Sequence, residues 1–224
     1  MILRILAVIT VAVIFWAIFE WILHRLNEDN EASRKLLHII HGVGLAVMAF
    51  VAPLWAVAIV DAIFLALVIA GRYIYKYKLK YIGPLQYLGK LYKVGRPSYG
   101  ELLFPLGVIA TAFIAHSEWE FAAAMLVLAL ADSAAALIGK RYGKKTAYKI
   151  LGQNKSIIGS AAFYVVTLTV VAGYIQLGGP GFSEGLPLAL LWMPIVITAA
   201  ENLGVYGSDN LLIPIVTVLL LNML

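Results

Sequence analysis

The sequence predicts an all-α, polytopic membrane protein with about eight (seven to eight) transmembrane helices and a polar site on the cytoplasmic face. Of its 224 residues, 62% are hydrophobic and 13% are charged, and the mean hydropathy is +0.92. Soluble domains average about 45–50% apolar and about 25% charged residues, so this composition is typical of a bilayer protein. The apolar segments are long and continuous, which favours helices over the alternating strands of a transmembrane barrel.

Eight apolar segments are candidate spans, because a membrane-crossing helix needs about 20 mostly apolar residues. They cover residues 2–25, 36–52, 54–74, 101–116, 119–139, 156–177, 186–202 and 210–224. The second, fourth and last are short. The first is longer than the apolar core of a signal peptide and lacks an A-x-A-like cleavage site, so we expect a retained helix. Without a convincing repeat or linker, residues 1–224 are expected to form a single integral membrane domain.

The distribution of Lys and Arg predicts the orientation. Most of the 17 basic residues lie between 72 and 96 or between 140 and 155, whereas the short connections at 52–53, 116–118 and 178–185 contain none. Cytoplasmic loops are enriched in Lys and Arg. We therefore expect the cytoplasm to contain residues 26–35, 72–100, 140–155 and 203–209, with both termini outside. The net charge of +5 is then a topological signal and does not indicate a nucleic-acid partner. The lack of cysteine excludes disulfide and thiolate chemistry.

The first polar cluster ends the fifth span, in ALADSAAALIGKRYGKK at residues 129–145. Asp132 shares a helix face with small residues as far as Gly139, which would let a ligand approach closely. A carboxylate on Mg²⁺ and basic side chains on phosphates would form a nucleotide site. The basic residues are Lys140, Arg141, Lys144 and Lys145. Alternatively, Gly139 and Gly143 only pack against a helix, and the basic run only anchors it at the membrane surface.

The second cluster, GQNKSIIGS at 152–160, opens the sixth span. Its residues Lys155, Ser156 and Gly159 would lie at a helix N-terminus, where free N–H groups and the helix dipole favour an anion. An ordinary cap formed by Asn154 or Ser156 is compatible with that role.

The third cluster, AAENLGVYGSDNLLIP at 199–214, joins the last two spans. Glu201 ends one helix, where the dipole disfavours a carboxylate, so we expect a cationic partner. Asp209, followed by Asn210, begins the next helix and could simply cap it. Alternatively, the tight turn brings both carboxylates together to complete a Mg²⁺ site with Asp132.

Two further segments carry polar residues. In ASRKLLHIIHG at 32–42, Arg34, His38 and His41 share a helix face, and contact with phosphate or a lipid headgroup is favoured over a metal site because no acid accompanies them. In VGRPSYGELLFPLG at 94–107, Glu101 is a general base, an ion-pair partner of a basic residue, or a first-turn residue favoured by the helix dipole.

Five of these segments occur in the order found in the polyprenol kinase family, which the chain resembles from about residue 33 to 216. They are RKLLHIIHG, YGELLFPLG, DSAAALIGKRYGKK, NKSIIGS and ENLGVYGSDNLLIP. The family includes dolichol kinase, phytol kinase and the CTP-dependent diacylglycerol kinase, and this short chain is more similar to the phytol kinase branch. The resemblance implies CTP as phosphoryl donor. The residues that match its elements are Arg34, Lys35, His38, Asp132, Gly139, Gly143, Lys144, Lys155, Ser156, Gly159, Glu201, Asp209 and Asn210.

We therefore expect CTP-dependent phosphorylation of a membrane isoprenoid alcohol of the phytol, geranylgeraniol or polyprenol/dolichol type. Mg²⁺ would bind Asp132, Asp209 and Glu201, basic side chains including Lys144 would stabilise the transferring phosphoryl group, and Glu101 or an aspartate would be the base. The alternatives are a diacylglycerol kinase and a cytidylyltransferase. The related phosphatidate cytidylyltransferases end in a segment with paired acidic residues and an arginine, whereas this chain has no Lys or Arg after Lys155, which disfavours the second alternative. A transporter or scramblase would need a polar path to the outer face. The oligomeric state does not follow from the sequence.

Overall fold

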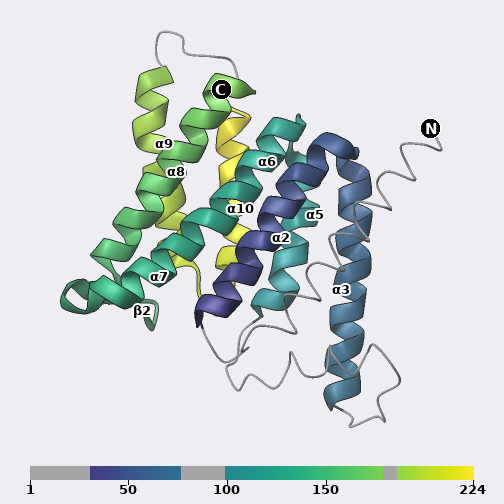
Figure 1. The fold of residues 1–224 in the computed structure, drawn as a ribbon, viewed down its shortest axis with the longest axis horizontal. Helices are drawn as coiled ribbons and strands as arrows, with labels where there is room; N and C mark the ends of the chain where they lie inside the picture. Colours follow the sequence, from purple (N-terminus) through teal and green to yellow (C-terminus); the bar gives the residue numbers. More distant parts are fainter. Residues whose placement is uncertain (1–30, 77–98, 179–185) are drawn as a thin grey trace.

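The computed structural model describes residues 31–76, 99–178 and 186–224, in which apolar helices run back and forth between two ends of a bundle (Figure 1). The helices are α2 Glu31–Val51, α3 Leu54–Lys76, α5 Gly100–Ile114, α6 Glu118–Leu126, α7 Asp132–Tyr142, α8 Ile157–Leu177, α9 Leu186–Leu203 and α10 Asp209–Leu221. A π-helical turn, η1 Val127–Ala131, joins α6 to α7, so that the three form one continuous element tilted across the bundle.

Seven of the eight predicted spans coincide with these helices, and the first, at 2–25, lies outside the described residues. Within the described residues, four helical segments are long and apolar enough to cross a membrane: Ala32–Val51, Leu54–Tyr73, Glu118–Thr146 and Ile157–Leu177. The other apolar helices, α5, α9 and α10, are shorter. The second span reaches full length because its helix begins five residues earlier than predicted. An all-α membrane architecture is thus supported, while the number of crossings stays a prediction.

The all-α prediction is wrong in one place, the loop expected at 140–155. After the 3-10 turn η2 Gly143–Thr146, strands β1 Ala147–Ile150 and β2 Gln153–Ser156 pair antiparallel. Leu151 and Gly152 form the turn with φ of 47° and 79°, a left-handed conformation that suits glycine and two-residue hairpins. Strands of four residues are too short for alternating polarity to distinguish them from a loop.

The centre of the bundle is built around α6 and η1. Phe121, Met125 and Leu128 are fully buried there, and small alanines between them let neighbouring helices approach closely. A Cβ at Gly42 of α2, for example, would collide with Ala129. Ser117 starts α6 through a capping box with Glu120, whose backbone N–H donates to Ser117 Oγ at 3.2 Å.

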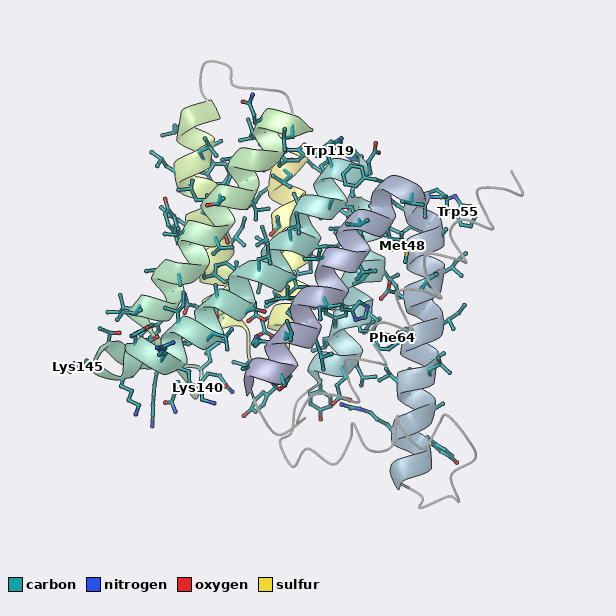
Figure 2. The ribbon with its side chains drawn as sticks, in the orientation of Figure 1. Met48, Trp55, Phe64, Trp119, Lys140 and Lys145 are labelled. Atoms are coloured by element: carbon teal, nitrogen blue, oxygen red, sulfur yellow. The ribbon has the colours of Figure 1, made fainter. Side chains whose placement is uncertain are left out.

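The outer surface is rich in exposed apolar side chains. Trp55, Ile63 and Phe113 are 60%, 58% and 75% exposed, and Figure 2 shows Trp55 at the outer edge of α3. On a water-soluble protein such a surface would be an aggregation liability, whereas facing lipid it carries no such cost. The structure therefore agrees with the membrane location that the composition predicts.

Candidate functional site

Five charged side chains from five elements meet at the end of the bundle where α2 and α10 begin, which we call the site end. They are Lys35 of α2, Asp132 of α7, Lys155 of β2, Glu201 of α9 and Asp209 of α10. Lys35 Nζ lies 2.5 Å from Asp132 Oδ2. Lys155 Nζ pairs with Glu201 Oε1 and donates to the Glu201 carbonyl at 3.0 Å. Each of the three carboxylates lies within electrostatic reach of the other two.

The π-turn η1 determines where Asp132 lies, because α7 begins directly after it. His38 Nε2 approaches both the Leu128 carbonyl, at 3.2 Å, and Asp132 Oδ2, at 3.4 Å. A carbonyl only accepts hydrogen bonds, so this contact assigns the ring hydrogen to Nε2. Ser133 Oγ lies 3.5 Å from the Lys35 carbonyl and adds a second link between α2 and α7. Single π-turns inside α-helices occur frequently at functional sites.

The charges of the site are buried or half-buried, and they do not fully cancel. The side chains of Lys35 and Asp132 are 11% and 9% exposed, and those of Lys155 and Glu201 are 18% and 5% exposed. With Asp209, three carboxylates face two lysines, which leaves one net negative charge when all five groups are ionised. The buried Glu201 Oε2 has no hydrogen-bond partner among the described residues. Since an unpaired buried charge is costly, this oxygen is suited to receive a cation or a hydrogen-bond donor.

A tight turn returns the chain from Glu201 to Asp209. Tyr206 and Gly207 have φ of 52° and 93°, and Ser208 Oγ accepts from the Val205 N–H at 2.9 Å. One alternative from the sequence was that this turn brings the two carboxylates together, and the Glu201 carboxylate lies within electrostatic reach of Asp209. The alternative that Asp209 caps α10 is wrong, because Ser208 occupies the cap position and Asp209 is the first helical residue.

The glycines of the first two motifs pack around Ser156, the N-cap of α8. Ser156 Oγ accepts from the Gly159 N–H at 3.1 Å, as expected of a cap. A Cβ at Gly139 would lie 3.0 Å from Ser156 Oγ, one at Gly159 would lie 2.9 Å from it, and one at Gly143 would collide with the Ser156 side chain. These contacts are the tight helix packing that we considered as the alternative. A contact of these glycines with a nucleotide stays a prediction.

The basic run after Asp132 lies apart from the carboxylates. Lys140, Arg141, Lys144 and Lys145 are all exposed. Figure 2 shows Lys140 and Lys145 at the outer tip beside the hairpin, and the Arg141 guanidinium lies 5.2 Å from the Tyr142 ring centroid. The lysines that contact the carboxylates are instead Lys35 and Lys155, which come from other segments.

Other predicted residues divide between the site and the helix contacts around it. Arg34 is exposed one residue before Lys35, whereas His41 packs against Phe104 and Phe64, with ring centroids 4.7 and 5.5 Å apart. Glu101 is 42% exposed and pairs with Arg72 at 3.2 Å, which is the ion-pair alternative. Asn210 Nδ2 donates to the Gly100 carbonyl at 3.3 Å and so joins α10 to α5.

The predicted Mg²⁺ site has suitable donor atoms, but its three carboxylates are not gathered as ligands of one ion. Carboxylate oxygens are the ligands that Mg²⁺ prefers, and Glu201 Oε2 is free to bind it. In residues 31–76, 99–178 and 186–224, however, no three His, Cys, Asp or Glu side chains gather around one point. Asp132 and Glu201 are held by lysines instead. Binding of Mg²⁺ by the three carboxylates therefore stays a prediction.

Three polar residues near the site were not predicted. Tyr148 of β1, Ser160 of α8 and Asn202 of α9 form one hydrogen-bonded group. Ser160 and Asn202 lie inside quoted motifs, next to residues that were selected for their charge or their glycine backbone. Tyr148 carries no sequence signal, because only the hairpin brings it to the other two.

Comparisons with known proteins give one relationship. No protein-family model and no solved structure matches the chain. A curated relative, described as phytol kinase, from Synechocystis sp., is 28% identical over 199 residues, which cover 87% of this chain and 80% of the relative. The match agrees with the five ordered motifs, and it supports the relationship of this chain to the polyprenol and phytol kinase family.

Proposed function

We propose that the protein is a membrane lipid kinase that transfers the terminal phosphoryl group of CTP to the hydroxyl of an isoprenoid alcohol. The observation that carries the proposal is the charged group of Lys35, Asp132, Lys155, Glu201 and Asp209 at one end of an apolar helix bundle, with three of its members buried and two half-buried. A lipid alcohol and a nucleotide can meet only where the bilayer borders water. The phytol kinase relative supports a lipid alcohol as acceptor, and the choice of CTP rests on the family resemblance.

The two lysines of the group, Lys35 buried and Lys155 half-buried, are suited to phosphate. Without nucleotide they neutralise Asp132 and Glu201. When the triphosphate binds, each Nζ would exchange its carboxylate for phosphate oxygens, so that little new desolvation is needed. Phosphoryl transfer depends mainly on positioning and on stabilising charge at the transferring group. Lysines already withdrawn from water act strongly on that charge.

The carboxylates released by the lysines would hold Mg²⁺. Asp132, Glu201 and Asp209 supply the hard oxygen donors, and the ion would neutralise charge on the phosphates. In the reaction, the alcohol oxygen forms a bond to the γ-phosphorus, the bond from that phosphorus to the β–γ bridging oxygen breaks, and CDP leaves. The alcohol proton passes to Asp132 or Asp209. Glu101 is not among the proposed bases because it is paired with Arg72 and 42% exposed.

The exposed basic tip has a different part in the proposal. Lys140, Arg141, Lys144 and Lys145 lie outside the charged group and would attract the anionic nucleotide from solution. The same charges would keep this end of the bundle on the cytoplasmic side. The proposal thus separates basic residues that recruit the nucleotide from those that act on it.

The decisive experiment is product analysis with the purified protein. Labelled CTP or ATP is supplied with phytol, geranylgeraniol, a long polyprenol or diacylglycerol, with the Asp132→Asn variant as control. We expect CDP and an isoprenyl monophosphate from CTP, and neither from the control. Pyrophosphate together with a CDP-lipid, formed from a lipid phosphate, would instead identify a cytidylyltransferase. Phosphorylation of diacylglycerol alone would reassign the acceptor.

A further inference from the structure

The hairpin is attached to two helices by three side chains that the proposed reaction does not use. Tyr148 OH, from β1, donates to Asn202 Oδ1 of α9 and lies 2.8 Å from Ser160 Oγ of α8. Ser160 Oγ also lies 3.2 Å from Asn202 Oδ1. We call Tyr148, Ser160 and Asn202 the hairpin anchor.

The orientation of the Asn202 amide follows from its other contact. Its Nδ2 donates to the Thr198 carbonyl at 3.0 Å, and a carbonyl can only accept, so Oδ1 faces the two hydroxyls. Tyr148 and Ser160 each carry one hydroxyl hydrogen, so two hydrogens serve the three contacts of the group. Either hydroxyl can donate to Asn202 Oδ1, so removing one hydroxyl weakens the group without leaving Asn202 unpaired.

The anchor lies beside the ion pair of the site. Tyr148 is directly opposite Lys155 in the hairpin register, and Asn202 follows Glu201 in α9. Two facing residues of the hairpin thus contact two successive residues of α9, with Tyr148 on Asn202 and Lys155 on Glu201. Directly opposite residues of an antiparallel pair project on the same face, so fixing one side chain limits where the other can reach.

We propose that Tyr148, Ser160 and Asn202 are positioning residues that hold Lys155 at the phosphate-binding position beside Glu201. The inference rests on the proposed function, in which Lys155 acts on the transferring phosphoryl group. A two-stranded hairpin with four-residue strands is marginal on its own. The flexible side chain of a lysine also loses conformational entropy when its ammonium group must stay at one point. The anchor restricts the hairpin and, through it, the Lys155 side chain, because it joins the hairpin to α8 and to α9 at the residue next to Glu201.

The test compares two variants that each lose one tyrosine hydroxyl, one inside the anchor and one outside it. Tyr148→Phe deletes the hydroxyl that donates to Asn202. Tyr164→Phe deletes another tyrosine hydroxyl of the same region, which donates from α8 to the Leu191 carbonyl of α9 at 3.5 Å, away from Lys155. We expect Tyr148→Phe to lower kcat/KM for CTP about tenfold, the size of one hydrogen bond, while the protein stays folded. Tyr164→Phe should keep wild-type kinetics.

A double-mutant cycle then shows whether the hydroxyl acts through the lysine. If it does, Tyr148→Phe lowers kcat/KM in the wild type but causes no further loss in the Lys155→Ala background. An equal, additive loss in both backgrounds overturns the inference, and so does a Tyr148→Phe variant with wild-type kinetics while Lys155→Ala is impaired. If Lys155→Ala itself keeps wild-type kinetics, the role of Lys155 in the proposed function fails, and the inference fails with it.

Discussion

Asp132 is the residue on which most of the proposed chemistry depends, and its lysine partner changes what a substitution there can show. The sequence predicted both the carboxylate and Lys35 as site residues but not their pairing, which joins positions 97 residues apart along the chain. Neutralising one member of a buried ion pair leaves the other charge alone and costs about 3–5 kcal/mol, whereas replacing both by apolar groups of similar size is often neutral. A single variant at Asp132 therefore mixes lost chemistry with lost stability.

The first prediction separates the two effects. Asp132→Asn should lower activity at least ~100-fold, a loss of about 2.7 kcal/mol in transition-state stabilisation, and should also lower the melting temperature because Lys35 is left unpaired. The double variant Lys35→Met/Asp132→Leu should regain most of the thermal stability and remain inactive. Melting in detergent and initial rates are measured on the same preparations. A stable double variant that retains activity would remove Asp132 from the site.

The second prediction concerns the two classes of lysine. Lys155→Gln should mainly lower kcat, because the half-buried side chain acts on the transferring group, by about tenfold or more. Lys144→Gln should mainly raise the KM for CTP, since an exposed lysine acts by long-range attraction that salt screens. Kinetics at low and high ionic strength distinguish them: the Lys144 effect should shrink in salt, and the Lys155 effect should persist. The reverse pattern would contradict the division of the basic residues.

At the level of elements, the sequence predicted the long apolar helices but missed the short elements, a π-turn and a β-hairpin. The long apolar helices follow from composition summed over about 20 residues. The π-turn at Val127–Ala131 and the hairpin at Ala147–Ser156 occupy too few residues for any periodicity. The pairing of Lys155 with Glu201 depends on that hairpin, so the motifs identified both residues but not their contact.

The third prediction tests the contact of α7 with α8 through two glycines of the same helix. A Cβ at Gly159 would lie 2.9 Å from Ser156 Oγ and 3.0 Å from the Ala135 carbonyl, whereas nothing lies within 4 Å of one at Gly173. Gly159→Ala should destabilise the protein by about 1–3 kcal/mol through overpacking. Gly173→Ala should be neutral or stabilise it by up to about 1 kcal/mol through helix propensity. Thermal melting compares the two, and equal melting temperatures would argue against tight packing at Gly159.

Across the whole molecule, charge is distributed unequally between the two ends of the bundle. The site end contains the exposed basic tip and the five charged side chains of the site, of which Lys35, Asp132 and Glu201 are buried. The opposite end, where α6 begins, contains Glu118 and Glu120, the second of which accepts from the His116 N–H at 2.6 Å. The sequence predicted this asymmetry from the Lys and Arg counts alone, and Figure 1 shows the hairpin and the first turns of α2 and α10 at the same end of the bundle. That this end faces the cytoplasm stays a prediction of the positive-inside rule.

The last prediction tests that orientation directly, and the chain is suited to it because it contains no cysteine. Lys149→Cys and Glu118→Cys place single thiols at exposed positions, on the hairpin and at the start of α6, respectively. Neither residue belongs to the proposed site, so both variants should keep activity, which shows that each is correctly inserted. In intact cells a membrane-impermeant thiol reagent should label only the Glu118→Cys variant, and the Lys149→Cys variant should react only after the membrane is opened. Labelling of both variants from outside would place the two ends on one side. Labelling of the Lys149→Cys variant alone would put the site on the face away from cytoplasmic CTP.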